Sequence, residues 1–386
     1  MRGRLLSFSL FGESHGKAIG VLIEGLPPGI EVSLEELRKE LERRKGIERF
    51  STKRKETDEP RIISGVFRER TTGAPVAVIV ENRDVDSSHY EEIKNTPRPG
   101  HADYPARVKY FGYNDYRGGG HFSGRLTVGV VIAGYFAKKL LEREGIAVRA
   151  YLKRIGCVEA HVSPGELLNS ENPYCPDERA FEAMMEEMER ARKAGDSVGG
   201  VIEAVAFNVP PGLGGPWEED IEADIASALF RIPAVKGVEF GLGFRFAELR
   251  GSQANDPFLL KDGKVVTETN NHGGVLGGIT TGMPLVVRVA FKPAPSIYLP
   301  QRTVDLERME DVTLKLRGRF DSCIVPKALP VVEGALAFVI ADHLLRRRAW
   351  EGLVGESKIL NSGIRLQNGE VMSHQYQTQN LWSSPF

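Results

Sequence analysis

Residues 126–144 read Leu-Thr-Val-Gly-Val-Val-Ile-Ala-Gly-Tyr-Phe-Ala-Lys-Lys-Leu-Leu-Glu-Arg-Glu, and this stretch predicts a long apolar helix. A second stretch, residues 326–348, has the same character. Each stretch is apolar, follows a loop rich in arginine and glycine, and carries basic residues toward its end. This likeness is the first indication that the chain contains an internal repeat.

A strand, a turn and a helix also occur twice. Residues 18–25 form a strand-like run that ends at Pro27-Pro28-Gly29, a turn in which proline presets φ and glycine releases it. Residues 204–208 are again strand-like, Pro210-Pro211-Gly212 repeats the turn, and residues 218–230 predict a second helix. We therefore predict a duplicated α+β unit.

The helix after the first turn has its own start and stop signals. Ser33 and Glu36 predict a capping box, Leu37 and Leu41 lie on one helical face, and Gly46 ends the helix. Further strand-like runs are predicted at residues 61–67 and 75–81.

The composition argues against nucleic acid as a partner. The chain has 51 Lys+Arg against 52 Asp+Glu, whereas binding a row of phosphates demands an excess of positive charge over a whole face. With 386 residues and 41% hydrophobic content, the chain can bury roughly three quarters of its unfolded surface. Because no linker divides it, we expect a single domain over residues 1–386.

The cysteines and the N-terminus indicate the cellular compartment of the protein. Cys157, Cys175 and Cys323 are an odd number without paired spacing, which predicts free thiols in a reducing compartment. The N-terminus has no signal-peptide pattern, and no apolar run approaches the ~18 residues of a membrane span. We expect a cytoplasmic protein with no membrane contact.

Positive charge is concentrated in one loop that precedes the apolar helix. Its sequence contains Arg98-Pro-Gly-His101-Ala-Asp103, then Arg107, then Arg117-Gly-Gly-Gly-His121-Phe-Ser123-Gly-Arg125. Guanidinium groups and flexible backbone in one loop suit a small ligand with several negative charges. The glycine run matches neither a Walker loop nor a dinucleotide fingerprint, so a nucleotide or flavin would bind outside a Rossmann domain.

Two histidines are candidate proton donors. His15 lies in the tight turn Gly12-Glu-Ser-His-Gly16, where an imidazole titrates near neutral pH, although a solvated surface turn is the alternative. His101 is followed by Asp103, which would orient the ring if the loop turns back; a structural histidine capping a turn is the alternative. No spacing of histidine or cysteine predicts a metal site.

Two later segments carry charge next to apolar runs. Lys292-Pro-Ala-Pro-Ser296 follows an apolar run at residues 285–291 and predicts an extended strap with one cation and one hydroxyl. Asp321 follows Arg317 and Arg319 just before the second apolar helix. It is either a salt-bridged structural residue or a carboxylate that orients or relays a proton.

Taken together, these motifs resemble the chorismate synthase family over about residues 7–346. In chain order, the motifs that carry the resemblance are Gly12-Glu-Ser-His-Gly16, Arg98-Pro-Gly-His-Ala-Asp103, Arg117-Gly-Gly-Gly120, Gly251-Ser-Gln253, Asn270-Asn-His-Gly-Gly274, Gly277-Gly-Ile-Thr-Thr-Gly282, Lys292-Pro293 and Arg319-Phe-Asp321. The resemblance implies an α+β fold, a layered sandwich of helices between antiparallel sheets, assembled as a homotetramer.

The resemblance also implies an activity. The family converts 5-enolpyruvylshikimate 3-phosphate into chorismate, in the shikimate pathway of aromatic amino-acid biosynthesis, by a 1,4-anti elimination of phosphate. The reaction requires reduced FMN without net redox change, and some members reduce their flavin with NADPH. The substrate carries two carboxylates and a phosphate, about four negative charges in all, which accounts for the arginine-rich loop.

The resemblance also implies roles for the residues that match the family's motifs by position. The resemblance makes His101 a proton donor to the leaving phosphate, His15 a proton donor near the flavin, and Asp321 a carboxylate that assists removal of the C6 proton. The residues implied to bind substrate are Ser14, Arg44, Arg49 and Arg125, with Arg43 a rival to Arg44. The residues implied to bind the flavin are Arg44, Arg49, His121, Phe122, Ser123, Gln253, Ala254, Gly277, Lys292, Pro293, Ala294, Pro295, Ser296 and Arg319.

The chain departs from the family pattern in two places. After Arg-Gly-Gly-Gly the family commonly has Arg-Ser-Ser-Ala-Arg, whereas this chain has His121-Phe-Ser-Gly-Arg125, which replaces one flavin-site arginine and one serine. Residues 350–386 form a tail to which the sequence assigns no role. Two other hypotheses stay open: an NAD(P)H-dependent flavin reductase and a non-catalytic anion-binding module.

Overall fold

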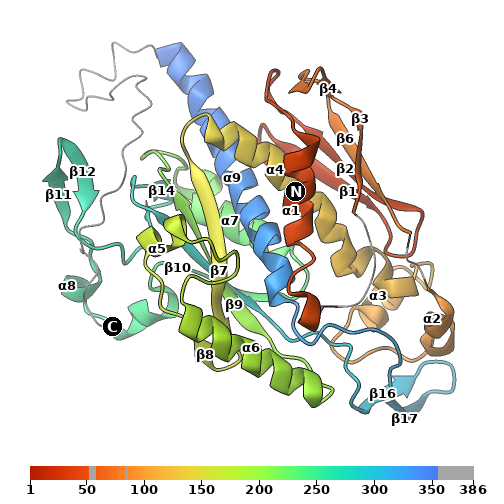
Figure 1. The fold of residues 1–386 in the computed structure, drawn as a ribbon. Helices are drawn as coiled ribbons and strands as arrows, with labels where there is room; N and C mark the ends of the chain where they lie inside the picture. The colour runs from red at the N-terminus through yellow and green to blue at the C-terminus, as the bar shows by residue number, and fades with distance from the viewer. Residues whose placement is uncertain (52–57, 84–85, 355–386) are drawn as a thin grey trace.

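The computed structural model describes residues 1–51, 58–83 and 86–354, so most of the tail lies outside the described residues (Figure 1). Two antiparallel sheets flank a layer of helices. The first sheet has the order β1 (Ser7–Gly12), β2 (Ala18–Glu24), β6 (Val76–Glu81), β3 (Pro60–Ser64). The second has the order β10 (Val235–Phe240), β15 (Leu285–Phe291), β9 (Gly200–Phe207), β7 (Ala147–Ile155), β8 (Val158–Glu159). The predicted layered α+β sandwich is confirmed.

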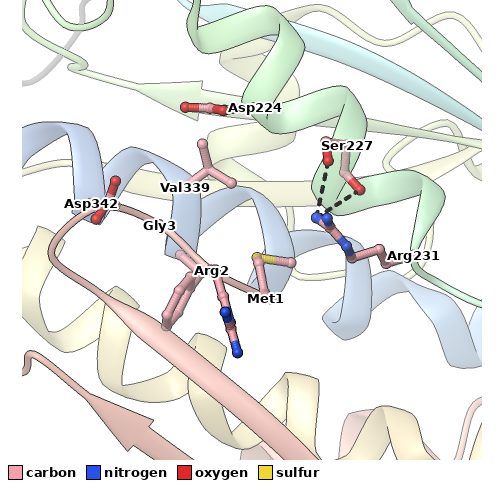
Figure 2. Close-up of a pocket in the computed structure, with 9 residues that line it drawn as sticks. Met1, Arg2, Gly3, Asp224, Ser227, Arg231, Val339 and Asp342 are labelled. Carbon is pink, nitrogen blue, oxygen red and sulfur yellow. Dashed lines mark hydrogen bonds between the residues drawn. The ribbon is translucent and has the colours of Figure 1, made fainter. Parts of the chain in front are cut away.

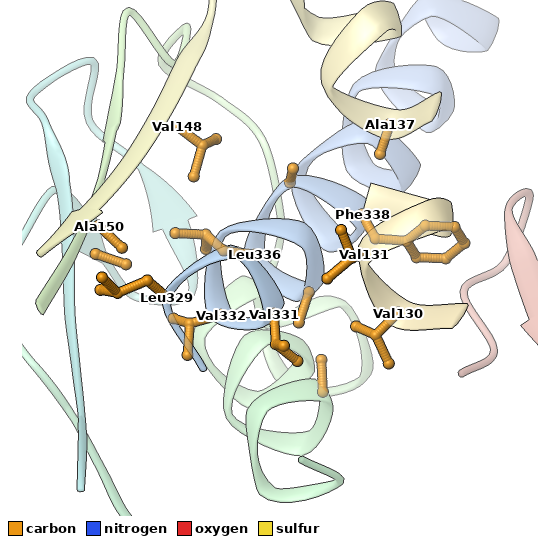
Figure 3. Packing of buried hydrophobic residues seen from close by; sticks show 14 of the residues in the cluster. Val130, Val131, Ala137, Val148, Ala150, Leu329, Val331, Val332, Leu336 and Phe338 are labelled. Atoms are coloured by element: carbon orange, nitrogen blue, oxygen red, sulfur yellow. The ribbon is translucent and has the colours of Figure 1, made fainter. Parts of the chain in front are cut away.

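The helices between the sheets are the predicted apolar ones and their partners. They are α4 (Thr127–Glu142), α9 (Val325–Val354), α1 (Leu34–Arg43) and α7 (Ile221–Phe230). Helix α4 packs on the first sheet, α9 packs on the second, and the two helices pack against each other. Their side chains interdigitate with those of β7 (Figure 3), and this buried cluster forms the core.

Shorter elements surround these layers. The helices are α2 (Ser88–Ile93), α3 (Asp103–Lys109), α5 (Pro164–Asn169), α6 (Glu178–Lys193) and α8 (Gly251–Ala254). Short hairpins are formed by β4 (Val66–Phe67) with β5 (Arg70–Thr71), β11 (Phe258–Lys261) with β12 (Lys264–Thr267), β13 (Val275–Leu276) with β14 (Ile279–Thr280), and β16 (Gln301–Asp305) with β17 (Glu310–Leu314).

Two glycines let α4 and α9 approach closely. A Cβ atom added to Gly134 of α4 would overlap with the Cα atom of Gly334 in α9. Glycine lowers the helix propensity at both positions, so its presence indicates that close packing of the two backbones outweighs that cost. The crossing holds the two halves of the molecule together.

The first Pro-Pro-Gly turn is held by a threonine from a neighbouring hairpin. Thr71, at the end of β5, accepts the Gly29 N–H at its carbonyl (2.7 Å) and the Ile30 N–H at its hydroxyl (2.9 Å). The same hydroxyl donates to the Pro27 carbonyl (2.6 Å). Three hydrogen bonds therefore fix the chain between β2 and α1.

The second Pro-Pro-Gly turn repeats these contacts. Thr280, at the end of β14, accepts the Gly212 N–H at its carbonyl (2.8 Å) and the Leu213 N–H at its hydroxyl (2.9 Å), and donates to the Pro210 carbonyl (2.7 Å). In each half, the strand that carries the turn pairs with a second strand: β2 pairs with β6, and β9 pairs with β15. A long connection then leads from β6 to α4 and from β15 to α9. The predicted duplication is thus present in the hydrogen bonding, and these two connections hold most of the predicted site residues.

Two local predictions need correction. The Ser33 hydroxyl accepts the Glu36 N–H (3.3 Å), but the Ser33 N–H donates to the Tyr135 hydroxyl (2.8 Å), so only half of the capping box forms. The second predicted helix begins at Ile221 rather than at residue 218, because the Asp220 carboxylate caps it and residues 217–219 form a separate 3₁₀ turn.

The N-terminus docks on α7 and α9 (Figure 2). The backbone N–H groups of residues 4–6 all donate to the buried Asp342 carboxylate, at 2.8–3.1 Å. A cavity of about 80 Å³ remains beside Met1 and Arg231, whose guanidinium donates to Ser227 (3.0 Å to Oγ). The start of the chain is therefore part of the packed structure.

The membrane expectation requires one correction. Residues 325–352 of α9 are long and apolar enough to cross a membrane, although no such run was expected from the sequence. However, 94% of the most apolar 18-residue window is buried inside the protein. The helix is the centre of the core, which explains its composition.

Candidate active site

A turn of three glycines joins the two predicted histidines. Gly118, Gly119 and Gly120 all have positive φ (60°, 82° and 54°), which glycine adopts without strain. A Cβ atom at Gly118 would overlap with the His15 ring, and one at Gly119 would lie 3.1 Å from Cε1 and Nε2 of His101. The two imidazoles therefore lie against neighbouring residues of one turn, as the proposed site requires.

His101 is held by a carboxylate and a guanidinium. Its Nδ1 lies 2.6 Å from Asp103 Oδ1, and Arg98 donates to the same carboxylate through Nε (2.7 Å) and Nη2 (2.8 Å). Burial disfavours the charged form of Asp103, but these hydrogen bonds outweigh it and hold the pKa of Asp103 well below its usual range. The ionised carboxylate places a proton on Nδ1 and leaves Nε2 on the side of the Gly119 turn.

His15 is buried in a different environment. Its Nδ1 lies 2.9 Å from the Ser87 hydroxyl, and its ring meets the Tyr90 ring edge to face at a centroid distance of 5.2 Å. The Arg98 guanidinium lies over the same Tyr90 ring, 5.6 Å from its centroid. Tyr90 of α2 thus connects the surroundings of the two histidines.

A buried carboxylate joins two of the predicted substrate-binding arginines. Asp58 accepts from Arg44 Nη2 (2.6 Å) and forms a second ion pair with Arg125. Asp58 and Arg125 have side chains that are each only 4% exposed. Burial opposes ionisation of Asp58, yet the charges of Arg44 and Arg125 lower its pKa, so the triad carries a net positive charge.

This arginine triad is connected to the His15 turn through Asn82. Arg125 Nε donates to Asn82 Oδ1 (3.1 Å), and the Asn82 amide donates to the carbonyls of Glu13 (3.0 Å) and Gly16 (2.9 Å). Asn82 directly follows β6, so the end of the strand fixes both groups. The turn between Glu13 and Gly16 contains both Ser14 and His15.

The predicted strap lies against the His101 loop. Lys292 donates to the Gly100 carbonyl, and Arg98 Nη1 donates to the Ser296 hydroxyl (3.4 Å). The Ala294 carbonyl accepts from Ser197 (2.7 Å), and Pro293 packs on Gly199 while Pro295 packs on Gly100. Burial, with a smaller contribution from Lys236, lowers the pKa of Lys292. The strap is thereby anchored on one side of the histidines.

Asp321 and Arg319 come from the connection that leads into α9. Asp321 Oδ1 pairs with Lys327 Nζ (2.6 Å), so a salt bridge is present as the structural alternative expected. Hydrogen bonds from Ser88 mainly lower the pKa of Asp86, and the charges of His15 and Arg319 contribute further. Arg319 and His15 therefore act electrostatically on one carboxylate.

The residues that depart from the family pattern lie at the edge of this cluster. His121 Nδ1 is 3.0 Å from the Gly12 carbonyl, and Phe122 packs on Tyr110 with ring centroids 6.1 Å apart. The Ser123 hydroxyl accepts the Arg125 N–H (3.3 Å) and so orients the start of α4.

Four predicted residues lie away from the histidines within this chain. Arg49 is 60% exposed and pairs with Glu189 of α6. Gln253 and Ala254 belong to α8, and Gly277 lies in the β13–β14 turn. In Figure 1, α8 and α3 lie at opposite sides of the molecule, so Gln253 and Ala254 do not join the His101 cluster in a single subunit.

Asp58, Asn82, Ser87 and Tyr90 were not predicted from the sequence. The sequence could have indicated Asn82, because it is a polar residue directly after a buried strand. Such residues lie at the end of a sheet, where ligand-binding sites often occur. Nothing in the sequence indicated Asp58, since its partner Arg125 is 67 residues away. Within the described residues, no group of three His, Cys, Asp or Glu side chains is placed to hold a metal ion.

Comparisons with known proteins show which family the chain is similar to. The family model described as chorismate synthase matches residues 6–345. A chorismate synthase from Thermococcus kodakarensis is 90% identical over 354 residues, which are 92% of this chain and 100% of that protein. One from Korarchaeum cryptofilum is 53% identical over 89% of this chain and 97% of its own length.

The fold gives the same result. A chorismate synthase crystal structure superposes with a TM-score of 0.71 at 34% identity, covering 90% of this chain and 93% of that one. These matches do not favour a free-standing flavin reductase, and they identify an enzyme of the carbon-oxygen lyase class. The chain belongs to the chorismate synthase family.

Proposed function

We propose that this protein converts 5-enolpyruvylshikimate 3-phosphate into chorismate by 1,4-anti elimination of phosphate, at the cluster where His15 and His101 meet the Gly118–Gly119 turn. The observation that carries the proposal is this meeting of the buried His15 ring and the partly buried His101 ring, beside the buried guanidiniums of Arg98 and Arg125. An elimination that expels phosphate needs proton donors and a cationic environment in one pocket.

Two buried polar atoms support an anionic ligand in this pocket. Ser14 Oγ and Arg44 Nε make no hydrogen bond to any described residue. Such groups are costly unless something satisfies them, and a phosphate or carboxylate oxygen would accept from both. With Arg98, Arg125 and Lys292 nearby, the pocket suits a substrate of about four negative charges.

The residues of this chain supply binding and proton transfer. In its doubly protonated form, with Nδ1–H on the Asp103 carboxylate, His101 would donate its Nε2 proton to the leaving phosphate and become the neutral imidazole. Asp321 would accept the C6 proton through the carboxylate that also accepts from Lys327 Nζ (2.6 Å). His101 comes from the connection between β6 and α4, and Asp321 comes from the connection between β15 and α9.

Reduced FMN fits as the cofactor. The residues that would hold it are Arg319, Ser123 and the strap of residues 292–296, and the strap contacts the His101 loop through Lys292 and Ser296. When bound, reduced FMN supplies electron density to the allylic system as the carbon-oxygen bond breaks. We infer that Gln253, Ala254 and Gly277 reach the same flavin from a neighbouring subunit of a homotetramer. Their position across the molecule from the histidines supports this inference.

The test is phosphate release from the substrate under strict anaerobiosis with photoreduced FMN. His101→Ala and Asp321→Ala should retain FMN binding and lose most turnover, by roughly 10²-fold or more. His161→Ala, an exposed histidine remote from the cluster, is the matched control and should keep full activity. Full activity in either site variant would contradict the assigned roles.

The same assay separates the other two hypotheses. Activity that appears with NADPH in place of photoreduced flavin would add a flavin reductase function to the elimination. A non-catalytic anion-binding module would bind the substrate but release no phosphate, even with reduced FMN present.

A further inference from the structure

A second cavity, of about 200 Å³, lies next to the His101 loop. Its walls come from α2, α3, the connection between them, the loop after α3 and the β16–β17 hairpin, which adjoin one another in Figure 1. Arg98 and Asp103, the two residues that hold His101, line this cavity. His15 and His101 themselves do not line it. We call it the α2–α3 cavity.

The charge of the lining is positive. Lys94, Arg98 and Arg107 contribute three cations, and Asp103 is the single carboxylate. Asp103 is already committed to Arg98 and His101 at 2.6–2.8 Å. Lys94 forms a loose ion pair with Glu91 at 3.9 Å, and the nearby Asn95 amide donates to Glu307 (2.6 Å). Arg107 has no carboxylate partner among the described residues, so its guanidinium favours an anion at this end of the cavity.

Several polar groups of the lining have donors to spare. The Lys94 ammonium is 3.9 Å from Glu91 Oε2, beyond hydrogen-bonding distance. The Arg107 guanidinium donates through Nη1 alone, to Asn95 Oδ1 (2.7 Å) and the Lys94 carbonyl (3.3 Å). These bonds also place Lys94, Asn95 and Arg107 together, as one polar end of the cavity.

The other walls are apolar or aromatic. Ile93, Leu306 and Pro97 line the cavity together with the rings of Tyr90 and Tyr116. A flat hydrocarbon ring packs favourably on such walls, and inorganic phosphate alone would leave them in contact with water. At ~30 Å³ per water molecule, the volume corresponds to roughly seven waters, which suits a single small ring.

We propose that the α2–α3 cavity is a second ligand site, which binds a small organic monoanion, a carboxylate on a flat ring, with the carboxylate on Arg107 and Lys94. The site differs from the pocket at the glycine turn, since it contains neither His15 nor Arg125. It takes a ligand of lower charge than the substrate, because Glu91 and Glu307 lie at its cationic end.

Occupancy of this cavity acts on the active site through two shared residues. A ligand on its walls contacts Arg98 and Asp103, and these side chains fix the orientation and the tautomer of His101. Displacing either by a few tenths of an ångström misplaces the proton donor, which lowers kcat. The effect on kcat rests on the proposed function, whereas binding of the ligand in the cavity does not.

Binding is tested by isothermal titration calorimetry with benzoate at constant ionic strength. We expect one benzoate per chain, and affinity reduced by about tenfold or more in Arg107→Gln. Lys109→Gln removes a cation from the same helix outside the cavity, and should bind like the unmodified protein. Benzamide, which has the ring without the charge, should bind at least about tenfold more weakly. Equal benzoate affinity in Arg107→Gln and Lys109→Gln would overturn the site.

A cavity-filling variant provides an independent check. Leu306→Trp places a large side chain into the cavity from the hairpin side, and should abolish benzoate binding while retaining the folded circular dichroism spectrum. In turnover assays, benzoate should lower kcat of the unmodified protein and leave Leu306→Trp unaffected. Inhibition that is purely competitive and persists in Leu306→Trp would place benzoate in the substrate pocket and overturn the coupling.

Discussion

At the scale of single residues, the proposed proton transfers depend on the glycine turn between the two imidazoles. Gly118 and Gly119 leave no space for a Cβ atom beside His15 and His101, so the turn itself sets the separation of the two rings. A proton donor works only when it is placed within hydrogen-bonding reach of the group that receives the proton. The glycines are therefore positioning residues for the reaction.

This leads to a prediction for Gly118→Ala. The added methyl group would displace the His15 ring, so kcat should fall by roughly 10²-fold, and stability should fall by about 1–2 kcal/mol because alanine adopts positive φ unfavourably. Gly145→Ala is the matched control, since Gly145 has φ of +68° and open space around it. It should lose similar stability in thermal unfolding but keep its activity. Equal activity in the two variants would show that the turn does not position His15.

The sequence predicted the site residues that lie in short motifs, but it did not predict the residues that pair with them across the fold. His15, His101 and Asp103 could be found because each lies in a short motif, and the return of the loop that brings Asp103 to His101 is local. Asp58 could not be found, because its role depends on Arg44 and Arg125 meeting across the fold. Arg49 and Gln253 were assigned to the same pocket, and nothing in their neighbouring residues indicates that they lie elsewhere in the subunit.

At the scale of elements, the crossing of α4 and α9 holds the two halves of the duplicated unit. The long apolar helices and the first buried strands could be predicted from periodicity, and β15 occupies the apolar run at residues 285–291. The hairpins β4–β5 and β13–β14 could not, because two-residue strands carry no periodic signal. Their threonines nevertheless fix both Pro-Pro-Gly turns, and the repeat becomes clear only from those contacts.

Substitution at the crossing tests this packing. Gly134→Ala should destabilise the protein by about 1–3 kcal/mol, because the new methyl group overlaps with the backbone of Gly334. Gly352→Ala, in an open position of α9, should instead stabilise by about 0.5–1 kcal/mol, since alanine favours a helix. Chemical denaturation measures both. A Gly134→Ala variant as stable as Gly352→Ala would contradict the close packing of the two helices.

At the scale of the whole molecule, one subunit holds the histidines, the buried arginines and the strap in one cluster, while α8 lies across the molecule. The central claim is that the substrate and reduced FMN meet in this cluster, with α8 of a neighbouring subunit completing it. The most direct measurement is a crystal structure with substrate and oxidised FMN bound. The account predicts substrate oxygens within hydrogen-bonding distance of His101 and Arg125, and Gln253 of a neighbouring subunit against the flavin. Substrate bound away from the Gly118–Gly119 turn would contradict it.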